Sequence, residues 1–148
     1  MIVLSNSAVE VIPVGGTVTF NLEVAHTGCD ENGCRGAEYH RQGSGVVRLR
    51  GRNNRCNQKS IFDLSFNGNV TSGTAGTEVQ LAMAIDGAPL AETTMIETIG
   101  TANSYQNLGA RTYLSVCPGE DVTLTVVNTG TTALTLDANA ALTARRVA

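Results

Sequence analysis

The sequence predicts an all-β protein, a single antiparallel jelly-roll sandwich of about ten strands that occupies residues 1–148. Short segments of apolar and β-branched residues recur along the chain, and turn-forming residues separate them. No window of about twelve residues has apolar side chains at helical spacing without an interrupting glycine or β-branched run, so we expect almost no helix. A chain of this length can form one domain with a core of its own.

The expected strands follow from local patterns of apolar residues. Residues 17–25 have the clearest two-residue period, because polar side chains separate Val18, Phe20, Leu22 and Val24. Residues 60–70 alternate in the same way, with an apolar series at Phe62, Leu64 and Phe66. The other expected strands are residues 8–12, 45–50, 78–85, 92–98, 110–116, 121–128, 133–136 and 141–147.

Turn residues lie between these segments. Asp86-Gly87 predicts a tight hairpin turn, and Pro118-Gly119 and Asn128-Thr129-Gly130 mark further breaks. Two longer stretches, Thr27–Ser44 and Gly100–Leu108, are expected to be loops. A loop as long as Thr27–Ser44 is usually functional or is held in place by other contacts.

Composition and charge exclude several classes of protein. Hydrophobic residues make up 42% of the chain and charged residues 16%, which excludes a disordered chain. The net charge of −3 excludes a generally basic protein that binds polyanions. No apolar run reaches the roughly 18 residues of a membrane span. The start of the sequence does not have the pattern of a secretory signal, so we expect synthesis in a cytoplasm.

The second half of the chain resembles a known family. Residues 60–71 read Ser-Ile-Phe-Asp-Leu-Ser-Phe-Asn-Gly-Asn-Val-Thr. They resemble the strand pattern Tyr-x-Ile-x-Tyr-x-x-Asn-Val-Thr of bacterial and phage proteins with a C1q/TNF-like jelly roll. The hairpin of residues 79–90 and the segments 121–128 and 141–148 are also similar. The resemblance covers roughly residues 60–148 and includes no catalytic signature.

The resemblance implies a ten-stranded jelly roll that forms a compact homotrimer and is not an enzyme. Related domains form the tips of collagen-like exosporium glycoproteins, and short stand-alone members look like structural proteins encoded near phage capsid genes. This chain has no Gly-X-Y collagen stretch, so the resemblance favours a virion protein. We therefore expect a capsid decoration or head-fibre-like protrusion on the capsid surface, made in the host bacterial cytoplasm.

The expected partners are further copies of the chain and a capsid protein or another virion component, with no nucleic acid and no membrane. Small residues are expected to pack near a threefold axis, namely Ala82, Ala84, Val126 and Leu136. Two alternatives remain open: a carbohydrate- or receptor-binding trimeric tip, and a bacterial exosporium-type surface protein.

The long loop carries a cluster of possible metal ligands, His26, Cys29, Cys34 and His40. Two thiolates and two imidazoles suit tetrahedral zinc, which would be structural. The open alternatives are a disulfide between Cys29 and Cys34, or free thiols and exposed histidines. With that disulfide, Cys56 and Cys117 would be able to form a second one. Four cysteines allow three pairings, and the sequence does not choose among them. No other cofactor is expected.

Residues 35–59 form the only charge cluster of the chain, with seven basic side chains and one acidic one. We expect capsid attachment through Arg48, Arg50, Arg52 and Arg55, because arginine suits paired bonds to carboxylates at an interface. The competing interpretation is a solvated strand face.

A second candidate binding site is a ligand groove formed by Asn103, Tyr105 and Asn107. Sugars stack on aromatic rings and bond to amides, so these residue types indicate carbohydrate binding. Motifs of common hydrolases, metalloproteases and nucleotide-binding loops do not occur in the sequence. The sequence therefore predicts a protein that acts by binding rather than by catalysis.

Overall fold

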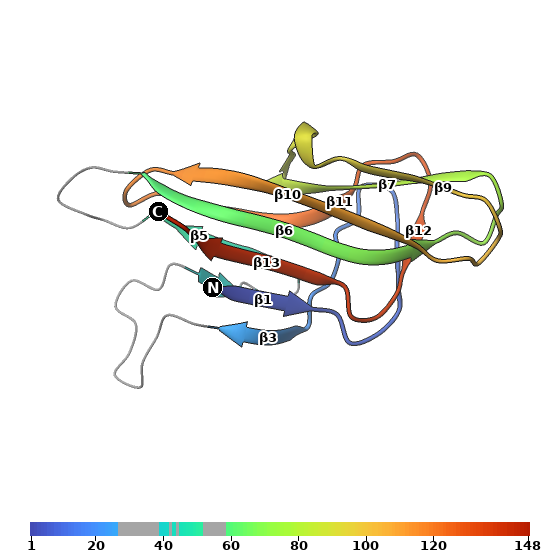
Figure 1. The fold of residues 1–148 in the computed structure, drawn as a ribbon, viewed down its shortest axis with the longest axis horizontal. Coiled ribbons are helices and arrows are strands. Elements are labelled where there is room, and N and C mark those ends of the chain that lie inside the picture. Colours follow the sequence, from blue (N-terminus) through green and yellow to red (C-terminus); the bar gives the residue numbers. More distant parts are fainter. Residues whose placement is uncertain (27–38, 42, 44, 52–58) are drawn as a thin grey trace.

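The computed structural model describes residues 1–148 except 27–38, 42, 44 and 52–58 (Figure 1). The described residues form two antiparallel sheets that pack face to face as a jelly-roll sandwich, which confirms the predicted fold class. Sheet A contains β1 (Ile2–Ser5), β2 (Glu10–Ile12), β3 (Leu22–His26), β6 (Ser60–Thr71), β10 (Gln106–Val116), β12 (Leu134–Leu136) and β13 (Ala141–Arg146). Sheet B contains β4 (Tyr39–Arg41), β5 (Val47–Arg50), β7 (Thr77–Ile85), β8 (Ala88–Pro89), β9 (Met95–Ile99) and β11 (Asp121–Asn128).

The order of the strands in sheet A is β2-β12-β6-β13-β1-β3, and β10 pairs with the other edge of β6. Because β6 is long, β13 pairs with its first half and β12 with its end. In sheet B the order is β4-β5-β11-β7-β8, and β9 also pairs with β7. The described residues contain thirteen strands rather than the expected ten because β1, β4 and β8 lie outside the expected strand segments.

The core lies between the two sheets and follows the predicted alternation along β6. Phe62, Leu64 and Phe66 are buried, whereas the residues between them face outward. The Phe66 ring packs edge-on against Phe20, with 6.4 Å between centroids and 72° between the ring planes. Such aromatic pairs stabilise a core beyond the area that they bury.

The predicted strand at residues 17–25 is wrong in part. Thr17 forms an isolated bridge with Val127 of sheet B, whereas Leu22–His26 pairs with β1 of sheet A. The chain therefore crosses from one sheet to the other between these points. Val18 and Phe20 are buried as expected, but Leu22 and Val24 are exposed on β3, where the register with β1 shifts beside Val3 and Leu4.

Several boundaries also differ from the predictions. β10 begins at Gln106, inside the expected loop Gly100–Leu108, and β4 lies inside the expected loop Thr27–Ser44. Residues Ala91–Thr93, at the start of the expected strand 92–98, form a 3₁₀ turn. The Asp86-Gly87 hairpin turn is confirmed, since both residues have positive φ, 50° and 81°.

Candidate functional site

The outward face of sheet A carries most of the polar and aromatic groups that are candidates for binding. Exposure alternates along β10, so that Asn107, Gly109, Arg111 and Tyr113 point away from the core. Each lies opposite an outward residue of β6: Asn107 opposite Asn69, Gly109 opposite Asn67, Arg111 opposite Ser65, and Tyr113 opposite Asp63.

Asp63 is the centre of an ion-pair group on this face. Arg111 donates to both Asp63 oxygens, from Nε at 2.7 Å and from Nη2 at 2.6 Å. Arg145 of β13 reaches the same carboxylate from the other side, at 3.8 Å. The hydrogen bond from Arg111 lowers the pKa of Asp63; burial opposes this shift, and the charges of Arg111 and Arg145 add to it. Asp63 is therefore ionised at neutral pH and holds two arginines beside it.

Tyr113 extends this group. The Arg111 guanidinium lies 5.7 Å from the centroid of the Tyr113 ring and donates to its hydroxyl at 3.3 Å. The ring itself remains 61% exposed. Ile61 and Val147 are also exposed here and are joined by a hydrogen bond from Val147 N–H to Ile61 O. We call Ile61, Asp63, Arg111, Tyr113, Arg145 and Val147 the terminal patch, since both chain ends lie near it (Figure 1).

Exposed apolar side chains are concentrated on sheet A as a whole. Among the described residues, the large exposed ones in or next to its strands are Val11, Leu22, Val24, Ile61, Tyr105, Tyr113 and Val147. Within the described part of the chain, Ile96 is the only large exposed apolar residue in a strand of sheet B. Val9 and Val14 lie in connecting segments.

Three asparagines form a second polar group on the same face, which we call the amide cluster: Asn67, Asn69 and Asn107. The amides of Asn67 and Asn107 each donate to the other at 3.2 Å. Asn107 also donates to Asn69 Oδ1 at 3.0 Å and to Gly68 O at 3.4 Å. All three residues are exposed.

Two of the three predicted groove residues lie together. Tyr105 directly precedes β10, and alternating exposure places it on the same side as Asn107. Asn103 lies in the preceding turn with a φ of 60°, and its N–H donates to Ser72 O. The sequence reasoning missed Asn67 and Asn69, although their outward positions in the alternating segment 60–70 would have indicated them.

The predicted attachment arginines are only partly described. Arg48 and Arg50 point outward from β5, opposite the buried Val47 and Leu49. Asp121 of the neighbouring β11 pairs with both, forming a direct ion pair with Arg48 and lying 3.6 Å from Arg50 Nε. This arrangement fits the solvated strand face as well as an attachment site. Arg52 and Arg55 lie outside the described residues.

The predicted metal cluster is not tested. His26 ends β3 of sheet A and His40 lies in β4 of sheet B, whereas Cys29 and Cys34 lie outside the described residues. In the described part of the chain, no group of three or more His, Cys, Asp or Glu side chains is arranged to hold a metal ion. A chelator that lowers the melting temperature would support zinc, and a reductant that does so would support a disulfide.

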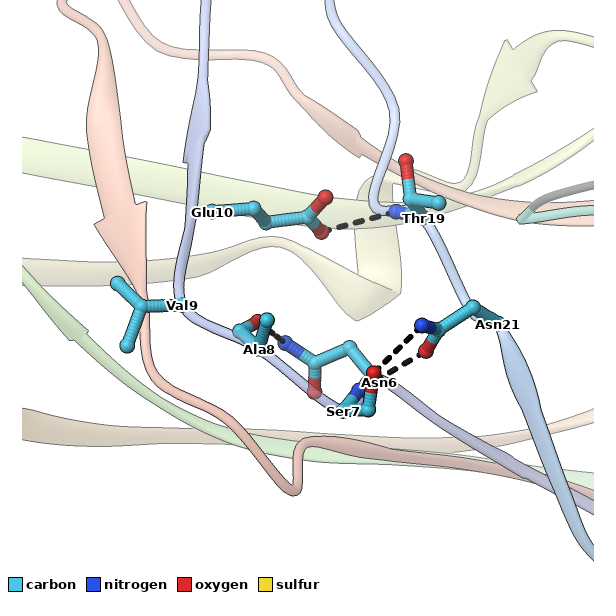
Figure 2. A pocket seen from close by; sticks show the side chains of 7 residues that line it. All are labelled: Asn6, Ser7, Ala8, Val9, Glu10, Thr19 and Asn21. Atoms are coloured by element: carbon cyan, nitrogen blue, oxygen red, sulfur yellow. Dashed lines mark hydrogen bonds between the residues drawn. The ribbon is translucent and has the colours of Figure 1, made fainter.

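A shallow hollow of about 180 Å³ lies beside the segment that precedes β2 (Figure 2). Its polar groups hold the chain together: Glu10 accepts from Thr19 N–H at 2.8 Å, and Asn21 accepts from Ser7 N–H at 2.8 Å. Asn6 donates to Ala8 O and to Asp137 O. These bonds fix the connection before β2 against residues 19–21, so the hollow is a structural feature.

The predicted small-residue contact surface is wrong. Val126 and Leu136 belong to the core between the sheets and are not exposed at all. Ala82 and Ala84 of β7 are also buried, at most 1% exposed. Small size and β-strand position do not distinguish an interface residue from a core residue, and here all four are covered within a single chain.

Known structures share this fold. The globular domain of zebrafish complement 1qA protein is similar with a TM-score of 0.64 and 10% identity, over 99% of this chain and 96% of that one. Murine APRIL, solved at pH 5.0, is similar with a TM-score of 0.52 and 13% identity, over 93% of this chain and 98% of that one. These likenesses define the fold as a C1q/TNF-like jelly roll. No protein-family model and no curated protein sequence matches the chain.

The helical content of the described residues is limited to one short 3₁₀ turn, and no helix there is long and apolar enough to cross a membrane.

Proposed function

We propose that the chain is a non-enzymatic structural domain that assembles as a homotrimer and serves as an accessory protein of a phage particle. It would act as a capsid decoration or a head-fibre-like protrusion. The observation that carries this proposal is the terminal patch, where exposed Ile61, Tyr113 and Val147 gather on the outward face of sheet A. The virion role itself rests on the resemblance of residues 60–148 to bacterial and phage jelly rolls.

The terminal patch has the composition of a protein interface. Tyr and Arg are the residue types that most often dominate binding at interfaces, and both occur there with two exposed aliphatic side chains. Asp63 holds Arg111 in a fixed orientation, so little side-chain freedom remains to be lost on association. Identical copies that meet head to tail through different parts of such a face form a ring when the rotation closes, and a trimer is the ring that the resemblance implies.

With sheet A at the trimer contact, sheet B faces outward and is free to meet the particle. Its outward side carries Arg48, Arg50 and Asp121. An acidic surface on a capsid subunit would compete with Asp121 for these arginines, and such contacts weaken as salt rises. The same surface would be a solvated strand face if attachment occurs elsewhere.

Sedimentation of purified particles, followed by mass spectrometry, tests the virion role. We expect the chain to sediment with capsid protein, and its absence from particles made by a host that expresses it would contradict the proposal. Arg48→Ala combined with Arg50→Ala tests the attachment surface, with Lys59→Ala as the control for loss of charge. We expect the double variant to be lost from particles at low salt, and the control to be retained.

A further inference from the structure

We propose that the amide cluster and Tyr105 form a binding site for a neutral carbohydrate. The proposal goes beyond the structural role described above, since it assigns a ligand to a separate part of sheet A. It rests on three features: the hydrogen-bonding capacity left in the cluster, the exposed Tyr105 ring on the same side, and the absence of a side chain at Gly109.

The hydrogen bonds within the cluster hold its amides in place and leave part of their capacity free. A primary amide has two N–H donors and an oxygen that can accept two bonds. Asn107 is the centre and uses its nitrogen on Asn67, Asn69 and Gly68. Asn67 donates once, to Asn107, and no described residue accepts a bond from the Asn69 nitrogen. Unused amide donors and acceptors of the cluster are therefore available to a ligand.

This capacity distinguishes the cluster from the hollow near Glu10. In the hollow, most bonds of the polar side chains go to backbone groups and hold the fold together, and Asn21 donates to the Ser7 hydroxyl. In the amide cluster, three of the four bonds join side chains to one another on an exposed surface. Water or ligand hydroxyls can replace them without disturbing the strands.

Tyr105 and Gly109 shape the surface around the amides. The Thr71 hydroxyl donates to Ser104 O at 2.8 Å and keeps the chain beside β6 just before Tyr105. The Tyr105 side chain is 43% exposed, two residues from Asn107 along the strand. Gly109, on the other side of Asn107, is exposed, and a Cβ atom there would lie 3.3 Å from Asn67 Nδ2, so the glycine leaves room for the Asn67 amide. The result is a surface with the Tyr105 ring at one end and the Asn67 amide beside Gly109 at the other.

The chemistry of this surface fits a neutral sugar. Each sugar hydroxyl both donates and accepts, as does an amide, and the C–H face of a sugar ring packs on an aromatic ring. The amides carry no charge, and Arg111 on the same strand is engaged by Asp63, so the surface suits an uncharged ligand. Residues two apart on a strand lie about 7 Å from each other and adjacent strands about 5 Å, which suits one or two sugar rings.

The site shares no residue with the terminal patch, although Arg111 lies two positions from Gly109 on β10. Asn69 and Ile61 lie on the same strand, eight residues apart, which corresponds to about 26 Å. A trimer contact centred on Tyr113 and Ile61 therefore leaves room for a ligand at Asn69. Carbohydrate binding and self-association can be measured independently.

The test is binding of the full chain to a panel of immobilised neutral oligosaccharides, containing glucose, galactose, mannose and N-acetylglucosamine units. We expect at least one to bind, with binding weakened about tenfold or more by Asn107→Ala, since that change removes several hydrogen bonds of the cluster. Asn69→Ala, at an exposed position, should weaken it as well. Thr98→Ala on the outward side of sheet B is the matched control and should bind as the unchanged chain does.

A second pair of variants separates stacking from polar contact. Tyr105→Phe keeps the ring and should retain binding, whereas Tyr105→Ala should lose it. Circular dichroism establishes that each variant is folded. The proposal is overturned if no neutral oligosaccharide in the panel binds, or if folded Asn69→Ala and Tyr105→Ala variants bind as tightly as the control.

Discussion

Arg111 and Asp63 form a two-point ion pair across strands β10 and β6, with both bonds shorter than 2.8 Å. The Asp63 side chain is only 12% exposed, whereas that of Arg111 is 59% exposed. The carboxylate is thus fixed in the sheet surface, and the guanidinium that it holds stands beside Tyr113. The pair therefore joins an outward residue of β6 to Arg111 in the terminal patch, through which we propose that the copies associate.

The ion pair predicts a specific dependence of stability on pH. The pKa of Asp63 in the folded chain lies below 3.8, its ordinary value, because Arg111 stabilises the carboxylate. Its stabilising contribution is therefore present above that ordinary value and is lost as the pH falls through the lowered pKa. Between about pH 5 and about pH 2.5, the free energy of unfolding should fall less in Asp63→Asn than in the unchanged chain. Equal pH dependence in urea titrations of the two chains would contradict this.

Phe66→Ala tests the core at the contact between the sheets. Phe66 is buried against Phe20, and removing a buried aromatic side chain leaves a cavity. We expect a loss of about 3–5 kcal/mol in the free energy of unfolding, measured by urea titration. Tyr105→Ala removes an exposed ring and should change stability by no more than about 0.5 kcal/mol. Similar losses in the two variants would argue against the assigned faces of the strands.

Gly51→Ala tests a close backbone contact that follows β5. A Cβ atom at Gly51 would clash with Cys117 O. Gly51 N–H donates to Glu120 O, and Gly51 O accepts from Gly119 N–H. The backbone segments would have to separate, at a cost of about 2 kcal/mol or more. At Gly100 a Cβ meets nothing within 4 Å, so Gly100→Ala is the control and should be near neutral. A melting temperature of Gly51→Ala equal to that of the control would contradict the contact.

The layers and many strands were predictable because alternation reports which side of a strand is buried. In β6 the outward series Ile61, Asp63 and Ser65 and the inward series Phe62, Leu64 and Phe66 are both confirmed. The same rule failed at residues 17–25, because Leu22 and Val24 continue the apolar series after the chain has changed sheets. Alternation within a segment does not show in which sheet that segment pairs with other strands.

The candidate sites were harder to predict because they combine residues from different strands. Asp63 and Arg111 are 48 positions apart, and only the register of β10 against β6 brings them together. Asn67 and Asn69 likewise join Asn107 through that register. Val126 and Leu136 show a second limit of sequence patterns. Apolar strand residues predict burial, but the pattern does not indicate whether the same chain or another copy covers them.

Tyr113→Glu tests whether the terminal patch is the contact between copies. Replacing the ring with a carboxylate removes its apolar contact area and adds a charge that must lose its water on association, which disfavours assembly. Ile96→Glu is the matched control, because Ile96 is 53% exposed on sheet B and Tyr113 is 61% exposed on sheet A. We expect Tyr113→Glu to shift the chain to monomer and Ile96→Glu to leave assembly intact.

The central claim is self-association through sheet A, and the most direct test is the mass of the unchanged chain and these two variants by light scattering at micromolar concentration. We predict a mass of about 46 kDa, three copies of 15.4 kDa, for the unchanged chain and for Ile96→Glu. Tyr113→Glu should give the mass of one copy. A monomeric unchanged chain, or a Tyr113→Glu variant that keeps the mass of three copies, would contradict the account.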